Sequence, residues 1–132
     1  MNISMEEVVS AEEPIARFIT GKDYYRPSNG TVKHNAFMPN GRGETSVYRT
    51  RDLIDDEIFG IGCVFFAEKI GKSLMGRADI AASEVFEKGL AIVSEPTPHP
   101  RHANIVDWPP DKSKIRMIAV ELAAKATLKL VS

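Results

Sequence analysis

The stretch between residues 54 and 70 constrains the fold most, because its apolar residues recur at helical spacing on two adjacent stripes. Acidic residues are concentrated at its start, between positions 52 and 57, and Gly71 follows it, as expected for the start and the end of a helix. The stripes consist of Ile54, Ile58, Ile61 and Phe65, and of Phe59, Cys63, Phe66 and Ile70. Two stripes give a wide apolar face. We therefore predict a central helix over residues 53–70 that is the least exposed helix of the protein.

Short strand-like runs separated by turns precede this helix. The turns contain Asn29-Gly30 and Asn40-Gly41, and asparagine and glycine both tolerate the positive φ of tight turns. Strand-like runs cover residues 15–19 and 46–49, and a partly alternating run covers residues 31–37. Short runs joined by such turns predict an antiparallel meander.

Helices and strands alternate after the central helix. A short helix is predicted over residues 81–88, an apolar strand over 90–93 and a final strand over 127–131. Pro109-Pro110 opens a last helix, since proline fits the first helical turn. The order predicts an α+β fold: a single domain with a mainly antiparallel sheet of short strands, packed on a buried central helix and a C-terminal helix. We assign residues 15–132 to this domain and residues 1–14 to an acidic N-terminal arm.

The charge of the chain is unevenly distributed. The net charge of −1 over 132 residues argues against a globally basic nucleic-acid binder. Residues 17–51 nevertheless carry seven basic and two acidic side chains, between acidic segments at residues 1–16 and 52–70. Such a basic region can attract an anion. Alternatively, the acidic flanks lie over the basic strands and neutralise them.

Cysteine content and hydropathy indicate a compartment. Cys63 is the single cysteine, so an intramolecular disulfide and a Cys-x-x-Cys zinc site are both excluded. The first residues lack the basic and apolar regions of a signal peptide. The longest apolar stretch, residues 58–67, is far shorter than the roughly 20 residues that span a bilayer. We expect a cytoplasmic protein without membrane contact, in which Cys63 is buried and inert.

One polar cluster stands out in the proline-rich segment 96–110. His102, Asn104 and Asp107 lie close together in the sequence, and a histidine can exchange a proton near neutral pH. Alternatively, these side chains satisfy backbone groups of a long loop. A metal is not expected, because Pro100 lies between His99 and His102 and prevents the helix that would orient the pair as ligands.

Four arginines are candidates for binding an anion, since a guanidinium pairs bidentately with phosphate or carboxylate. Arg49 and Arg51 end a strand, while Arg77 and Arg101 occur later in the chain. The alternative is that acidic neighbours such as Asp55 pair with them. If the polar cluster is functional, we expect one or more of these arginines beside His102.

Several segments together resemble small uncharacterised bacterial proteins of about this length. The similarity runs from about residue 15 to 130 and implies a bacterial origin, without an activity or any residue role. The segments are Arg17-Phe18-Ile19, Ser46-Val47-Tyr48-Arg49, Gly76-Arg77-Ala78-Asp79, Arg101-His102-Ala103-Asn104-Ile105 and Trp108-Pro109.

Three hypotheses about function follow. The first is a binding or interaction module for an anionic ligand or a partner protein, using strands 17–51 and loop 96–110. The second is a small enzyme for a phosphorylated or nucleotide-like substrate, with His102 as acid or base and arginines as the anion clamp. The third is nucleic-acid binding with Tyr24, Tyr25 and Phe37 as stacking surfaces, which ranks last because the acidic segments oppose it. No cofactor is expected, and a homo-oligomer or a protein partner both remain open.

Overall fold

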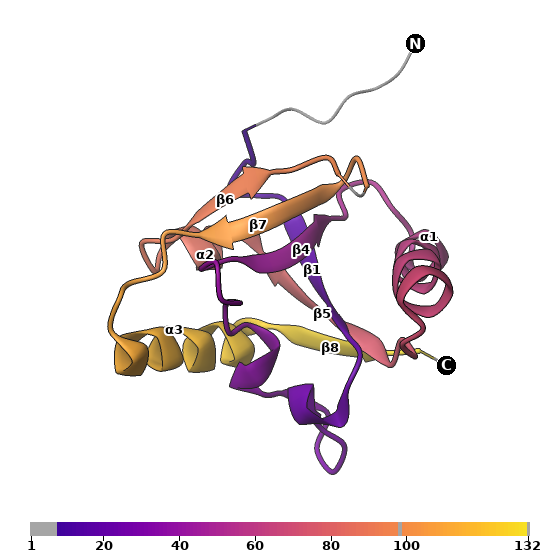
Figure 1. Ribbon diagram of the computed structural model, residues 1–132, viewed down its shortest axis with the longest axis horizontal. Coiled ribbons are helices and arrows are strands. Elements are labelled where there is room, and N and C mark those ends of the chain that lie inside the picture. Colours follow the sequence, from indigo (N-terminus) through magenta and orange to yellow (C-terminus); the bar gives the residue numbers. More distant parts are fainter. Residues whose placement is uncertain (1–7, 98, 132) are drawn as a thin grey trace.

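A six-stranded antiparallel sheet forms the centre of the protein in the computed structural model, which describes residues 8–97 and 99–131 (Figure 1). Its strand order is β6-β7-β4-β1-β5-β8. The strands are β1 (Pro14–Ile19), β4 (Thr45–Arg49), β5 (Gly76–Ala81), β6 (Ala91–Ser94), β7 (His102–Val106) and β8 (Thr127–Leu130).

The remaining elements are helices and a separate two-stranded hairpin. The hairpin joins β2 (Tyr25–Arg26) to β3 (Thr31–Val32) through the predicted Asn29-Gly30 turn, and Gly30 there has a φ of 67°. The helices are α1 (Asp55–Gly62), which continues as the π-helix η3 (Cys63–Ile70), α2 (Ala82–Phe86), α3 (Lys112–Lys125), and the 3₁₀ turns η1 (Lys22–Tyr24) and η2 (His34–Ala36).

The predicted α+β class and the antiparallel sheet are confirmed, but the meander is wrong. β1 and β4 are neighbours in the sheet, yet between them the chain leaves the sheet to form the β2–β3 hairpin and η2. The second turn leads into β4 without joining two paired strands. Its loop closes on itself, because the Asn40 side chain accepts hydrogen bonds from the backbone N–H groups of Arg42 and Glu44.

The two faces of the sheet are covered differently. α2, α3 and η2 cover one face and bury the main core, which contains residues such as Ile15, Val47 and Leu122. α1 and η3 lie over the other face, where a small cluster of Phe18, Tyr48 and Ile58 is buried (Figure 1). The second face therefore has much less apolar cover than the first.

The central helix is present, but it is not the least exposed helix. Ile54 is 65% exposed, and Val64 and Ile70 are each 48% exposed. Two features explain the difference. The helix contacts the sheet along one side only, and from Cys63 onward it is a π-helix, whose i→i+5 bonds break the 3.6-residue stripes. Gly62 marks the close contact, because a Cβ there would lie 2.8 Å from the Phe18 ring.

Part of the predicted arm and of the predicted loop belongs to the packed domain. Residues 1–7 of the arm lie outside the described residues. Val9 is buried, and Val8 forms a bridge to Val93 of β6. Residues 102–106 of the predicted loop 96–110 form the strand β7. Its alternating residues Ala103 and Ile105 are fully buried in the main core.

Candidate functional site

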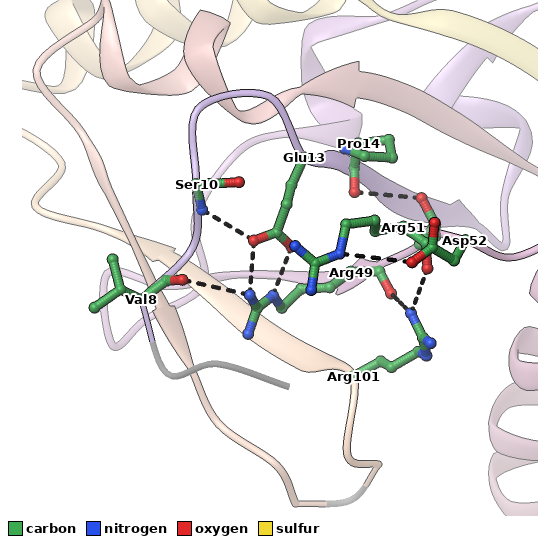
Figure 2. Close-up of polar contacts among 9 residues, drawn as sticks. Val8, Ser10, Glu13, Pro14, Arg49, Arg51, Asp52 and Arg101 are labelled. Carbon is green, nitrogen blue, oxygen red and sulfur yellow. Dashed lines mark hydrogen bonds and ion pairs between the residues drawn. The ribbon is translucent and has the colours of Figure 1, made fainter. Parts of the chain in front are cut away.

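Arg49 is buried in an ion pair rather than offered to a ligand. Its Nε and Nη2 donate to the two carboxylate oxygens of Glu13 at 2.8 and 2.7 Å (Figure 2). Glu13 also accepts a hydrogen bond from the backbone N–H of Ser10 at 2.9 Å. Burial raises the pKa of Glu13, but the hydrogen bonds from Arg49 and Ser10 outweigh it and hold the pKa below its usual value. The pair ties the segment before β1 to the end of β4.

Arg101 and Arg51 lie next to this pair. Arg101 Nη1 donates to the backbone carbonyls of Arg49 and Arg51 at 3.1 and 2.9 Å, so it caps the carboxyl end of β4 (Figure 2). The Arg51 side chain is 40% exposed, and its Nε lies 3.9 Å from the Asp52 carboxylate. Arg51 and Arg101 are both partly exposed.

Arg77 connects β5 to the start of α1. Its Nε donates to Asp79 at 2.9 Å and its Nη2 donates to Asp55, while its guanidinium carbon lies 4.6 Å from the centre of the Phe59 ring. The remaining nitrogen, Nη1, is buried and has no hydrogen-bond partner among the described residues. The two carboxylates keep the pKa of Arg77 above its usual value, although burial lowers it. Arg77 therefore pairs with acidic neighbours, which was the expected alternative to binding an anionic ligand.

His102 and Asn104 lie on the same face of β7 and share a network with β4 and β6. His102 Nε2 lies 2.7 Å from Ser46 Oγ, and His102 Nδ1 lies 3.0 Å from the backbone carbonyl of Glu95. A carbonyl can only accept, so Nδ1 carries the proton and Nε2 accepts the Ser46 hydroxyl. Asn104 donates to the Glu95 carboxylate. We call these four residues the Ser46–His102 cluster.

Asp107 does not join this cluster. It is exposed and follows the opposite end of β7, in a left-handed conformation with a φ of 68°. There it lines a shallow groove of about 390 Å³ together with Pro109 and Lys114. The structure therefore separates Asp107 from His102 by the length of the strand.

Sequence reasoning missed the cleft between the β2–β3 hairpin and α3, although one of its walls belongs to the basic segment 17–51. The cleft measures about 610 Å³. None of its lining residues is acidic; they are Arg26, Gly30, Thr31, Val32, His34, Val120, Ala123, Ala124, Ala126, Thr127 and Leu128. We call it the hairpin cleft. The Asn29-Gly30 turn was the available signal, but it did not show which helix the hairpin would face.

Cations shape the electrostatics of the hairpin cleft. Burial lowers the pKa of His34, and the positive charges of Arg116, Lys33 and Arg26 lower it further. Arg26 is exposed, and its Nη1 donates to Thr31 Oγ1 at 3.3 Å. The wall that carries His34 is fixed by Arg17, which donates to the carbonyls of Ala36 and Ser46 at 2.7 and 3.0 Å.

Three further observations concern other site types. Among the residues that the structure describes, no three His, Cys, Asp or Glu side chains come together as a metal site. Cys63 is half-buried rather than buried. No described helix is long and apolar enough to cross a membrane.

Comparison with known proteins adds no assignment to this geometry. No protein-family model, no curated protein and no solved structure matches the chain.

Proposed function

We propose that the protein is a binding module that holds a small organic anion in the hairpin cleft. The observation that carries the proposal is the composition of the cleft wall, which contains an arginine, a histidine and several apolar side chains, and no carboxylate. The volume of about 610 Å³ falls in the range of small-molecule sites. A carboxylate, sulfonate or phosphate attached to an apolar group fits this chemistry.

The electrostatics of the rim support an anionic ligand. The same cations that depress the pKa of His34 create a positive potential at the cleft. A bound anion would favour protonated His34 and raise its pKa in the complex. Binding is then coupled to proton uptake, so affinity for a permanently charged anion rises as the pH falls through the pKa of His34 in the complex and levels off below the pKa of His34 in the free protein.

The test uses 1-anilinonaphthalene-8-sulfonate, whose sulfonate stays ionised and whose rings are apolar. We expect saturable fluorescence enhancement that weakens about tenfold in Arg26→Gln, since charge-assisted contacts are the strong ones. Arg42→Gln is the matched control, because Arg42 is also an exposed arginine but does not line the hairpin cleft. Equal affinity of the Arg26→Gln and wild-type proteins for the probe would overturn the proposal.

The Ser46–His102 cluster supports a second candidate, a small enzyme. Its specific observation is the 2.7 Å contact between Ser46 Oγ and a His102 Nε2 that is free of a proton. In this arrangement His102 can accept the Ser46 proton as the hydroxyl attacks an electrophilic phosphorus or carbonyl carbon, and can pass that proton to the leaving group as its bond to the phosphorus or carbon breaks. Two of the arginines expected as an anion clamp, Arg49 and Arg77, are instead committed to ion pairs with Glu13 and Asp79.

A fluorophosphonate probe tests this second candidate, because it reacts with activated serines. We expect labelling that is lost in Ser46→Ala and kept in Ser113→Ala, a control at an exposed serine. A wild-type protein that stays unlabelled would leave the Ser46–His102 cluster a structural network.

The nucleic-acid hypothesis receives less support than the other two. Phe37 is fully buried and Tyr25 is 8% exposed. These rings pack in the main core, so they do not present the stacking surface that the hypothesis requires.

A further inference from the structure

The outward face of α3 carries exposed apolar residues. Met117 is 65% exposed and Val120 is 48% exposed, whereas Ala119 and Leu122 on the opposite face are buried. Around the two apolar residues, the exposed side chains recur at spacings of three and four and so form one stripe. The stripe consists of Ser113, Arg116, Met117, Val120, Glu121 and Ala124.

The side chains of the stripe line a surface groove. A groove of about 400 Å³ is lined by five of its six members, from Ser113 to Glu121. Met117 also borders the groove beside Asp107, and Val120 borders the hairpin cleft. An apolar side chain from another helix could enter this groove, which is the arrangement that packs two helices together.

The order of residues along the stripe is self-complementary about a two-fold axis. If the axis passes between the levels of Ile118 and Ala119, an antiparallel second α3 places its Glu121 opposite Arg116. Residues at equal distance from the axis lie at the same height, because each residue rises about 1.5 Å. The same operation sets Met117 opposite Val120 and Ser113 opposite Ala124.

We infer that the α3 stripe is the interface of a symmetric homodimer, with a second copy of this chain packed antiparallel across it. Symmetry makes each contact twice, so two Arg116–Glu121 pairs flank a centre of two Met117–Val120 contacts. A parallel pairing would set Arg116 beside Arg116 and is opposed by repulsion. A partner of one charge sign would match one end of the stripe and clash with the other.

The local contacts leave both charges able to pair across the interface. The Glu121 side chain is 54% exposed, and Lys88 Nζ lies 3.2 Å from one of its oxygens, Oε1. Arg116 is exposed. One helix face is smaller than a standard interface of about 800 Å² per partner, so we expect a weak dimer with a dissociation constant on the order of 100 µM.

Charge reversal tests the inference in sedimentation velocity runs without ligand, from about 20 µM to about 1 mM protein, a range that brackets the expected constant. Arg116→Glu and Glu121→Arg should each weaken association at least about tenfold, because each places like charges together twice. The double variant restores opposite charges and should restore the dimer. Lys112→Glu is the matched control, with the same charge change on the same helix outside the stripe.

Each other outcome overturns the inference. A wild-type protein that stays monomeric up to the highest concentration excludes the dimer. A dimer that ignores both single reversals lies at another surface. If the singles weaken association and the double variant does not recover it, the antiparallel register is wrong. Far-ultraviolet circular dichroism of every variant confirms that the exposed substitutions leave the fold intact.

Discussion

The two faces of the sheet treat their arginines differently. On the face covered by α2 and α3, Arg49 and its partner Glu13 are both sealed, with side chains 0% and 1% exposed. On the face covered by α1, Arg77 is buried, but its partners Asp79 and Asp55 are 24% and 62% exposed. A sealed pair has no alternative partner in water, whereas an open pair does. The amount of helical cover therefore decides how much each carboxylate contributes to the free energy of unfolding.

The α1 face carries two groups of polar residues, one on each side of its buried aromatic residues. Between neighbouring strands, Tyr48 of β4 pairs with His102 of β7, and Phe18 of β1 pairs with Arg77 of β5. The buried aromatic residues thus lie between the Ser46–His102 cluster on one side and the Arg77 pairs on the other. A single helix covers the middle of this face, and the flanks keep polar side chains that bond to one another.

Removing the sealed carboxylate should have the largest effect. Glu13→Gln leaves the Arg49 charge buried without its counter-charge, which we expect to cost about 3–5 kcal/mol of unfolding free energy. Chemical denaturation monitored by circular dichroism measures it. A loss no larger than that of Asp55→Asn would contradict the contrast between the two faces.

Glu13 also sets a pH dependence. Its pKa is lowered in the folded protein, so the stabilisation is present above the unfolded pKa of Glu13 and is lost as the pH falls through the folded pKa. The acid limb of the stability curve should therefore flatten in Glu13→Gln. Denaturation midpoints between neutral and acidic pH test this, and an unchanged acid limb would contradict it.

Shortening a core side chain should also cost more unfolding free energy on the α3 face than on the α1 face, but by a smaller difference. Leu122 is fully buried against the main core, and Leu122→Ala should cost about 2–5 kcal/mol. Ile61 is half-buried in the smaller cluster under α1. Ile61→Ala should cost less, because part of its side chain already contacts water. Equal losses in urea denaturation would show that the α1 face is as tightly packed as the other.

The open pair should respond to salt. Hydrogen bonding to Arg77 and its positive charge lower the pKa of the exposed Asp55, and water screens such a pair. We expect Asp55→Asn to lower the melting temperature less than Glu13→Gln does, with a difference from wild type that shrinks in high salt. A salt-independent loss would mean that Asp55 is effectively buried.

Local sequence patterns predicted much of the fold. What they missed was how much of each helix packs against the sheet. Turn chemistry located the Asn29-Gly30 hairpin, and Gly71 ends the central helix with a φ of 79° as expected. The burial of that helix was overestimated, because periodicity reports which residues are apolar, not how much sheet is available to cover them. Its change to a π-helix left no signal in the apolar pattern.

The Ser46–His102 cluster was predicted only in part, because its contacts depend on which strands pair. The sequence identified His102 and Asn104 as polar residues in an unusual segment, and the structure brings them together with Glu95. It could not show that Ser46 lies beside them, since the contact spans 56 residues and depends on the pairing of β4 with β7. The ion pairs of Arg49 and Arg77 likewise depend on which elements meet in space.

The smallest expected effect concerns the Ser46–His102 cluster and distinguishes a poised base from a passive bond. The Glu95 carbonyl fixes the proton on Nδ1, so nitrogen-15 spectra of the neutral His102 ring should show that proton on Nδ1 rather than on Nε2. Ser46→Ala removes the hydroxyl at Nε2 and should shift that nitrogen alone, at a cost of about 1 kcal/mol in stability. A proton on Nε2 would reverse the bond, making Ser46 the acceptor and His102 unable to activate it. The tautomer thus decides whether this flank of the sheet can do chemistry or serves only to satisfy its own polar groups.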